Sequence, residues 1–436
     1  KGAMTNNTTG QQNTAVGVNT MQCNTTGQYN SAFGFQAMNR ITDSEGNTGI
    51  GYQSLYTNTT GDANTAVGRD ALVSNTTANN NTAVGKDSLK ANTTAASNVA
   101  VGQGALQANT TALNNTAVGR VAGNKTTTGC QNVAIGTFAH CVNTTGENNI
   151  AIGVCSLCNN TTASQNTAVG FKSLYANTTG ASNVAVGYFA GLQNTTGNCN
   201  VSLGVAANQN TSTGLNNTAI GHIALLSNTT GGCNVALGAF ALDANTTGVQ
   251  NTAVGYQSLT VSTTGGNNTA FGSYTGDSVT TGINNTLIGF NGGHTLTTGD
   301  NNVAVGNLAG TDGVLNLTTQ DNQIVIGNNS NTAAYIKIDW SITSDLRDKT
   351  EIADVPYGLN FVNQITPIKY KFKTSRENET PNGKTRFGFK AQEILALEGD
   401  NPILVNNEDT DNLKLTGAYL VPVLVNAIKE LSETNK

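Results

Sequence analysis

Apolar residues along this chain recur in a fixed 17-residue pattern, which is neither the spacing of an amphipathic helix nor that of a long strand. The motif Asn-Thr-Ala-Val-Gly starts at Asn13, and its glycine returns every 17 residues from Gly17 to Gly306, in 18 copies. The residue before each glycine is always Val, Ile, Leu or Phe, and the residue four positions before it is always Asn. A constant period indicates that each unit is one coil and that equivalent residues stack.

The consensus unit, Asn-Thr-Ala-Val-Gly-x-x-Ala-Leu-x-x-Asn-Thr-Thr-Gly-x-x, predicts the elements of one coil. Its Ala-Val and Ala-Leu segments are predicted to form short strands with small side chains inside, and Asn-Thr-Thr-Gly a turn. The Asn column is predicted to form an amide ladder, and the Gly column a bend with positive φ or close backbone approach. Helix is disfavoured because no 3.6-residue period persists. The predicted fold is mostly β, a parallel β-solenoid (β-roll) over residues 5–306.

The predicted core of this solenoid is thin. Each coil supplies only three or four small or medium apolar side chains, so its stability must come from stacking between neighbours. Three parallel chains around one axis would bury the apolar column that remains, and a homotrimer is therefore expected. The next comparable glycine, Gly327, follows Gly306 by 21 residues, so the array is expected to end or change between 307 and 327.

A change in charge marks a second domain. Residues 1–333 hold 8 Lys/Arg and 11 Asp/Glu, whereas residues 334–436 hold 13 and 15, the composition of an ordinary soluble domain. A small α+β domain is expected there. Alternation predicts a strand over 334–340 and a hairpin of 368–372 with 385–389, with Pro381-Asn382-Gly383 in its tip.

Three helices are predicted in the same domain. A short helix is predicted over 357–362 and another over 392–397. Apolar residues at helical spacing between Leu413 and Leu431 predict a C-terminal amphipathic helix that pairs with its copies in a trimer.

Three segments in this domain resemble a known family. Ser344-Asp345-Leu346-Arg347-Asp348-Lys349 is similar to the Ser-Asp-x-Arg-x-Lys signature of the intramolecular chaperone domain of phage tailspikes and fibres, also called peptidase S74. The segment 388–394 is similar to its Gly-x-x-Ala-Gln-Glu-Val motif, and 420–424 resembles its closing helix. The resemblance covers about 335–433. The repeats resemble the coils in the head of trimeric autotransporter adhesins, whose period is shorter.

The resemblance implies a domain that trimerises the fibre, guides folding and releases itself by cleavage. It implies a Ser-Lys dyad in which Ser344 attacks the Thr343–Ser344 bond and Lys349 is the general base, with Asp345 and Arg347 holding the loop. A lysine serves as a base only if burial or nearby charge lowers its pKa from about 10.4. The alternative is that Ser344 and Lys349 are surface residues of a polar turn.

These observations predict a structural virion fibre. We expect a cloning scar at 1–4, the shaft at 5–306, a transition at 307–343 and the chaperone domain at 344–436. The fibre would be made in the host cytoplasm, be extracellular when mature, join other virion proteins at its N-terminal end and contact a host-surface receptor.

Two other functions compete with the fibre. The first is a bacterial cell-surface trimeric adhesin, which is expected to end in a membrane anchor, whereas this chain ends in the chaperone motif. The second is an enzyme acting on host polysaccharide, which needs paired carboxylates in a groove, but the 11 acidic residues of residues 1–333 are scattered along the chain. The only enzymatic activity predicted is self-cleavage by the Ser-Lys pair.

Charge, hydropathy and cysteine spacing give no sign of nucleic acid, a membrane, a metal or a cofactor as a partner. The net charge of −5 and pI of about 5.2 give no footprint for nucleic acid, and no apolar run reaches the ~20 residues of a membrane span. Seven cysteines without paired spacing argue against a disulfide framework, and Cys155-x-x-Cys158 has no second half-site, so no metal or cofactor is expected. Cys141 and Cys158 lie one period apart, at a separation that permits a disulfide, and are expected as free thiols in a reducing cell.

Overall fold

The computed structural model describes residues 2–312, 314–331, 335, 344–373, 376, 378–400, 402–407, 410–411 and 413–435. These residues form two compact units. The first runs up to Gly310 and includes Leu317–Ile326, and the second holds the segments 311–316 and 327–436. Each unit is described by itself.

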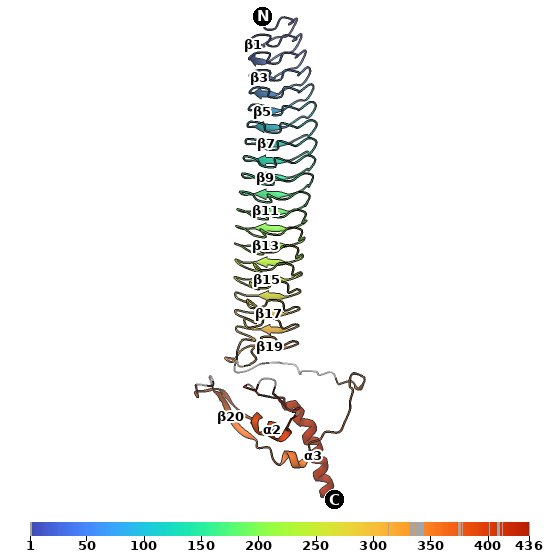
Figure 1. The fold of residues 1–436 in the computed structure, drawn as a ribbon, viewed down its shortest axis with the longest axis vertical. Helices are drawn as coiled ribbons and strands as arrows, with labels where there is room; N and C mark the ends of the chain where they lie inside the picture. The colour runs from blue at the N-terminus through green and yellow to red at the C-terminus, as the bar shows by residue number, and fades with distance from the viewer. Residues whose placement is uncertain are drawn as a thin grey trace. The chain divides into compact units, whose positions relative to one another are not determined.

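The first unit is a parallel β-solenoid, visible in Figure 1 as a stack of equal coils. Each coil contributes one three-residue strand, and every strand pairs in parallel with the strand of the next coil; Ala66, for example, lies opposite Ala83. The strands are β1 Thr14–Val16, β2 Ser31–Phe33, β3 Thr48–Ile50, β4 Thr65–Val67, β5 Thr82–Val84, β6 Val99–Val101, β7 Thr116–Val118, β8 Val133–Ile135, β9 Ile150–Ile152, β10 Thr167–Val169, β11 Val184–Val186, β12 Val201–Leu203, β13 Thr218–Ile220, β14 Val235–Leu237, β15 Thr252–Val254, β16 Thr269–Phe271, β17 Thr286–Ile288, β18 Val303–Val305 and β19 Ile324–Ile326. The predicted fold class, mostly β with 17-residue coils, is confirmed.

The repeat glycine ends each strand with a bend that other residues cannot adopt. From Gly17 to Gly306 its φ lies between 125° and 141°. A Cβ atom on Gly153 would lie 2.3 Å from the carbonyl oxygen of Gly170 in the next coil. Both the dihedral and the close backbone approach therefore require glycine, as predicted.

Two columns of buried asparagine tie the coils together. In the column four residues before the glycine, the side-chain Oδ1 accepts the backbone N–H of the next asparagine, as from Asn64 to Asn47 at 2.9 Å. In the column seven residues after the glycine, amide meets amide, as from Asn75 Nδ2 to Asn58 Oδ1 at 2.9 Å. The predicted amide ladder is therefore present, and it satisfies polar groups that burial would otherwise leave costly.

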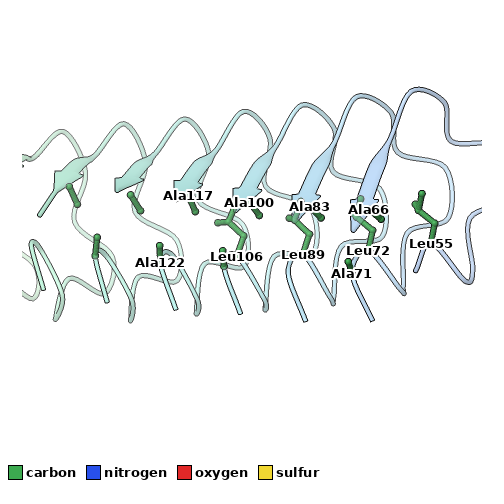
Figure 2. Packing of buried hydrophobic residues seen from close by; sticks show 14 of the residues in the cluster. Leu55, Ala66, Ala71, Leu72, Ala83, Leu89, Ala100, Leu106, Ala117 and Ala122 are labelled. Carbon is green, nitrogen blue, oxygen red and sulfur yellow. The ribbon is translucent and has the colours of Figure 1, made fainter. Parts of the chain in front are cut away.

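Alanine and leucine fill the interior between the coils. In one coil Ala66, Ala71 and Leu72 are fully buried, and the pattern repeats along the stack, as Figure 2 shows. The central residue of each strand, alanine in most of them, points inward, because successive side chains of a strand alternate between its faces. The core is as thin as the repeat predicts.

The Ala-Leu segment corrects one prediction. It was expected to be a second strand, but it forms a run of turns, and its leucine is left-handed: Leu72 has a φ of 51° and Leu89 one of 48°. The backbone is held there by the neighbouring coil, since the N–H of Leu72 donates to the carbonyl of Ser88 at 3.1 Å. Repeated inter-coil hydrogen bonds thus hold a conformation that leucine alone disfavours.

The parallel ladder continues through the 21-residue spacing. Strand β19 pairs with β18, so that Val303 lies opposite Ile324. The N–H of Leu317 donates to the carbonyl of Gly310 at 2.8 Å, while Thr311 and Asn316 form an antiparallel bridge. Extra residues therefore loop out from this last coil without breaking the stack.

The second unit is a small α+β domain. It contains the 3-10 helix η1 Leu346–Asp348, α1 Leu359–Val362, the antiparallel pair β20 Ile368–Lys373 and β21 Pro381–Gly388, and α2 Ala391–Glu398. A second antiparallel pair, β22 Val405–Asn406 and β23 Lys414–Leu415, precedes η2 Gly417–Tyr419 and the C-terminal helix α3 Leu420–Thr434. The core consists of Phe361, Ile394, Leu404, Val405, Leu420 and Val423.

Most of the elements predicted in this unit are confirmed, with two corrections. Pro381-Asn382-Gly383 was predicted in the hairpin tip but lies in β21, where Pro381 pairs with Lys373. The C-terminal helix begins at Leu420 rather than Leu413, because Lys414–Leu415 pairs with β22. The strand predicted over 334–340 falls outside the described residues apart from Tyr335.

Candidate functional site

The candidate site lies around η1, where the predicted dyad residues come together. Lys349 Nζ donates a hydrogen bond to Ser344 Oγ over 2.8 Å. The short helix brings the two side chains together, because its turn is closed by the N–H of Lys349 donating to the carbonyl of Leu346 at 3.2 Å. Thr343, the other residue of the predicted cleavage bond, lies outside the described residues.

Asp345 and Arg347 hold the loop between the two dyad residues. Asp345 caps η1 by accepting the backbone N–H of Arg347 at 2.9 Å, a common role for Asp at a helix start. The guanidinium of Arg347 also donates to both carboxylate oxygens of Asp345, at 2.6 Å from Nη2 to Oδ2. These hydrogen bonds lower the pKa of Asp345 and raise the pKa of Arg347, so the pair stays ionised. The loop-holding role of both residues stays a prediction.

The chemical meaning of the Ser-Lys contact depends on where the proton lies. With a protonated lysine, as in the hydrogen bond described above, Ser344 Oγ accepts. A nucleophilic serine requires the reverse, a neutral amine that takes the hydroxyl proton. Both side chains are exposed to solvent in the single chain, so desolvation of the amine would have to come from a substrate segment or from another copy.

The second motif, Gly388 to Ile394, contributes to the core of the same unit. It ends β21 and starts α2, and Ile394 is buried while Phe389 and Ala391 pack against the core. A Cβ atom on Gly388 would approach the ring of Tyr370 to 3.0 Å. The motif is thus accounted for by packing.

The C-terminal helix is fastened to α1 by polar contacts. Glu430 accepts the backbone N–H of Leu359 at 2.7 Å, next to the N-terminus of α1. Asn426 Nδ2 donates to the carbonyl of Tyr357 at 3.0 Å. A Cβ atom on Gly358 would collide with the Glu430 carboxylate, so glycine is required there. The position of α3 within the unit is therefore fixed by several contacts.

One face of α3 stays apolar and exposed. Its buried side consists of Leu420, Val423 and Ala427. A second set of apolar side chains, called here the outer helix face, is 43–65% exposed and follows helical spacing: Val421, Leu424, Val425, Ile428 and Leu431. A helix with two apolar faces is typical of one that packs on both sides.

The solenoid carries an exposed apolar column of its own. The last residue of every strand, called here the strand-face column, points away from the core. Val16, Phe271 and Ile326 are 55%, 58% and 67% exposed, eight further members are 37–44% exposed, and the remaining eight are partly buried. Its other members are Phe33, Ile50, Val67, Val84, Val101, Val118, Ile135, Ile152, Val169, Val186, Leu203, Ile220, Leu237, Val254, Ile288 and Val305. The sequence signal was the strict choice of Val, Ile, Leu or Phe before each glycine.

Two further features bear on the predicted partners. Among the described residues, no helix combines the length and apolar character needed to cross a bilayer. Within the same part of the chain, no three His, Cys, Asp or Glu side chains are grouped as a metal site.

Comparison with known proteins gives one match. Residues 344–400 match the model of the family Peptidase S74, described as chaperone of endosialidase. No curated protein and no solved structure matches the chain. The matched segment starts at Ser344 and includes η1, α1, the β20–β21 hairpin and α2. The chain therefore combines a β-solenoid with a C-terminal segment that matches this chaperone family, an arrangement that fits a tail-fibre or tailspike-like protein.

Proposed function

We propose that this chain is the shaft of a trimeric virion fibre, and that its C-terminal unit joins and aligns three copies before cutting itself free. The single observation that carries the trimer is the strand-face column, an uninterrupted apolar line on a solenoid with very few charges. Exposed apolar stripes of this extent are typical of interaction surfaces rather than of isolated soluble chains.

The magnitudes favour association. Burying one half-exposed Val or Ile side chain is worth on the order of 1 kcal/mol. The eleven members that are 37–67% exposed would therefore contribute on the order of 10 kcal/mol per chain, or on the order of 30 kcal/mol for three chains. The loss of translational and rotational freedom costs about 4–15 kcal/mol for each of the two association steps of a trimer, so burial of the stripe favours association.

The outer helix face gives the C-terminal unit its own means of association. Five apolar side chains on a 15-residue helix are enough for three copies of α3 to pack against one another at helical spacing. Such contact would form before the long shaft, because it involves few residues close in sequence.

Alignment is the reason for a chaperone at one end. Because every coil repeats the same columns, one chain can slip by 17 residues against another at little cost. A trimerised C-terminal unit sets the register first, and the coils then stack from that nucleus. Removing the unit afterwards takes away the template, which leaves a fibre that is kinetically trapped.

Cleavage would use the Ser344–Lys349 contact. A neutral Lys349 takes the hydroxyl proton while Ser344 Oγ attacks the carbonyl carbon of Thr343. The Thr343–Ser344 peptide bond breaks, giving an ester on Oγ and a free amino group on Ser344. Water then hydrolyses the ester, leaving a carboxylate on Thr343 and the restored serine hydroxyl. The 2.8 Å contact supports this assignment, because the base must lie within hydrogen-bond reach of the nucleophile.

The virion role rests on the family match and on the rod-like solenoid. We infer that the fibre is made in the host cytoplasm, joins other virion proteins at its N-terminal end and contacts a host-surface receptor once extracellular. The alternative, a bacterial cell-surface trimeric adhesin, is favoured only by the likeness of the repeats.

The outer helix face offers the sharpest test of the chaperone role. Ile428→Glu places a charge on the exposed face, where the side chain is 65% exposed and makes no contribution to the unit's own core. Lys429→Glu is the matched control, since it adds the same residue at an exposed neighbouring position. We expect Ile428→Glu to abolish the soluble oligomer and the control to keep it, as measured by size-exclusion chromatography with light scattering. An unchanged oligomer in Ile428→Glu would refute the role of α3.

A further inference from the structure

We propose that Cys141 and Cys158 are an oxidation site that forms a disulfide between two consecutive coils when the fibre meets a small-molecule disulfide. Their Sγ atoms lie 2.9 Å apart, and both cysteines are free thiols. Each lies five residues after a repeat glycine, Gly136 or Gly153, so the two occupy the same column of the stack.

The backbone brings the two cysteines together before any oxidation. The N–H of Val142 donates to the carbonyl of Cys158 at 3.2 Å, so the ladder fixes the distance between the two coils at this point. Stacked β-strands lie about 4.8 Å apart, within the 4.4–6.8 Å range of Cα separations that a disulfide spans. Little rearrangement is therefore needed to close the bond.

The other cysteines lack this arrangement. Cys23, Cys130, Cys199 and Cys233 have no thiol as the partner of a sulfur contact in the structure. Cys155 is three residues before Cys158, and burial raises its pKa, which keeps it protonated and slow to react. Either sulfur can be the donor in the contact between Cys141 and Cys158, and a hydrogen bond from Cys158 lowers the pKa of Cys141, so the pair offers one thiolate for attack.

The chemistry is a two-step thiol–disulfide exchange. The Cys141 thiolate attacks one sulfur of a disulfide such as oxidised glutathione, releases one glutathione thiolate and forms a mixed disulfide. Cys158 loses its proton to solvent, attacks Sγ of Cys141 and expels the second glutathione. Two protein thiols thus lose two electrons and two protons, and the small disulfide is reduced to two thiols. Both cysteines are partly exposed, so a small oxidant can reach them.

The disulfide would stabilise coils whose core lacks leucine. The column four residues after the glycine holds leucine in the four coils before Gly123 and in the two coils after His140, whereas Gly123 and His140 occupy it in two consecutive coils next to the cysteine pair. His140 Nδ1 and Thr126 Oγ1 are buried there without a hydrogen-bond partner. A bond from Cys141 to Cys158 would therefore link two coils beside positions that lack the core leucine and hold buried polar atoms without a partner.

The test uses the full-length protein with oxidised glutathione under native conditions, followed by alkylation of the remaining thiols. Digestion with trypsin and a glutamate-specific protease separates the two cysteines, because Glu147 lies between them. We expect the non-reduced digest to link peptide 126–147 to peptide 148–172, and fragmentation of the alkylated pair to assign the bond to Cys141 and Cys158. Hydrogen exchange of the coils between Gly136 and Gly170 should slow by about a hundredfold relative to the reduced protein.

Two variants make the result decisive. Cys141→Ser should lose the slowed exchange, whereas Cys199→Ser, which removes an exposed cysteine in another coil, should keep it. The inference is overturned if Cys141 and Cys158 stay alkylatable, if they end as glutathione adducts only, or if Cys141 pairs with Cys130 or Cys155 instead. Equal exchange rates in oxidised and reduced protein would equally overturn the stabilising role.

Discussion

Acid should weaken the shaft locally at His140. This side chain has no exposed surface and takes the place of a core leucine. Burial lowers its pKa from 6.5 to about 3, because a charged imidazole would lose its hydration. Its Nε2 lies 3.3 Å from Asn160 Nδ2, which can only donate, so the proton of the neutral ring lies on the unpaired Nδ1.

The stability of the coils around His140 falls as the pH is lowered, because the opened and folded coils differ in protonation. Between pH 6.5 and about 3 the opened coil binds a proton at His140 and the folded coil does not, so stability is complete above pH 6.5 and falls as the pH is lowered. Each pH unit below 6.5 costs about 1.4 kcal/mol. Going from pH 7.5 to pH 5.0 therefore costs about 2 kcal/mol, a roughly thirtyfold rise in local opening.

The assay is hydrogen exchange of peptides around His140, measured by mass spectrometry at pH 7.5 and pH 5.0. Correcting the rates for intrinsic exchange gives the change in local opening. The control is His140→Leu, which restores the residue found at Leu106 and Leu157 and keeps the left-handed backbone that Leu157 adopts at a φ of 48°. We expect the thirtyfold change in the wild type and a flat profile in the variant. The reasoning is refuted if both proteins show the same pH dependence in these coils.

Three further predictions concern the dyad, the bend and the ladder. Ser344→Ala and Lys349→Ala should each abolish conversion into the two fragments 1–343 and 344–436 on denaturing gels without changing the circular dichroism; cleavage in Ser344→Ala would exclude the serine nucleophile. Gly153→Ala should cost several kcal/mol, because the new Cβ meets the Gly170 carbonyl at 2.3 Å; an unchanged melting temperature would contradict the bend. Asn92→Ala should cost about 1–3 kcal/mol, since the amides stacked above and below lose a partner, and urea unfolding measures it.

The shaft could be predicted from its sequence because the same glycine spacing and the same asparagine position recur in every coil. The spacing from Gly17 to Gly306 gave the coil length, and the invariant asparagines gave the buried ladder. The second segment of each coil was misjudged, because a left-handed Leu72 is stabilised by hydrogen bonds from the next coil and not by any local preference. Local propensity does not contain that information.

The C-terminal unit followed its hydrophobic pattern less closely. Pro381 lies in a strand, where its lack of an N–H excludes it from the centre of a wide sheet but not from a two-stranded pair. Leu413 and Leu415 fit the spacing of the terminal helix, yet a pairing with β22 takes that segment. The closeness of Ser344 and Lys349 was available only as a resemblance, because five residues in a loop do not fix a distance.

The native mass of the intact protein tests the central claim most directly. Sedimentation equilibrium of the uncut chain should give three times the chain mass of 44.8 kDa, unchanged on tenfold dilution. A folded species of one chain mass, with the strand-face column exposed to water and the far-ultraviolet spectrum of a β-solenoid, would contradict the association of three chains on which the proposed fibre rests.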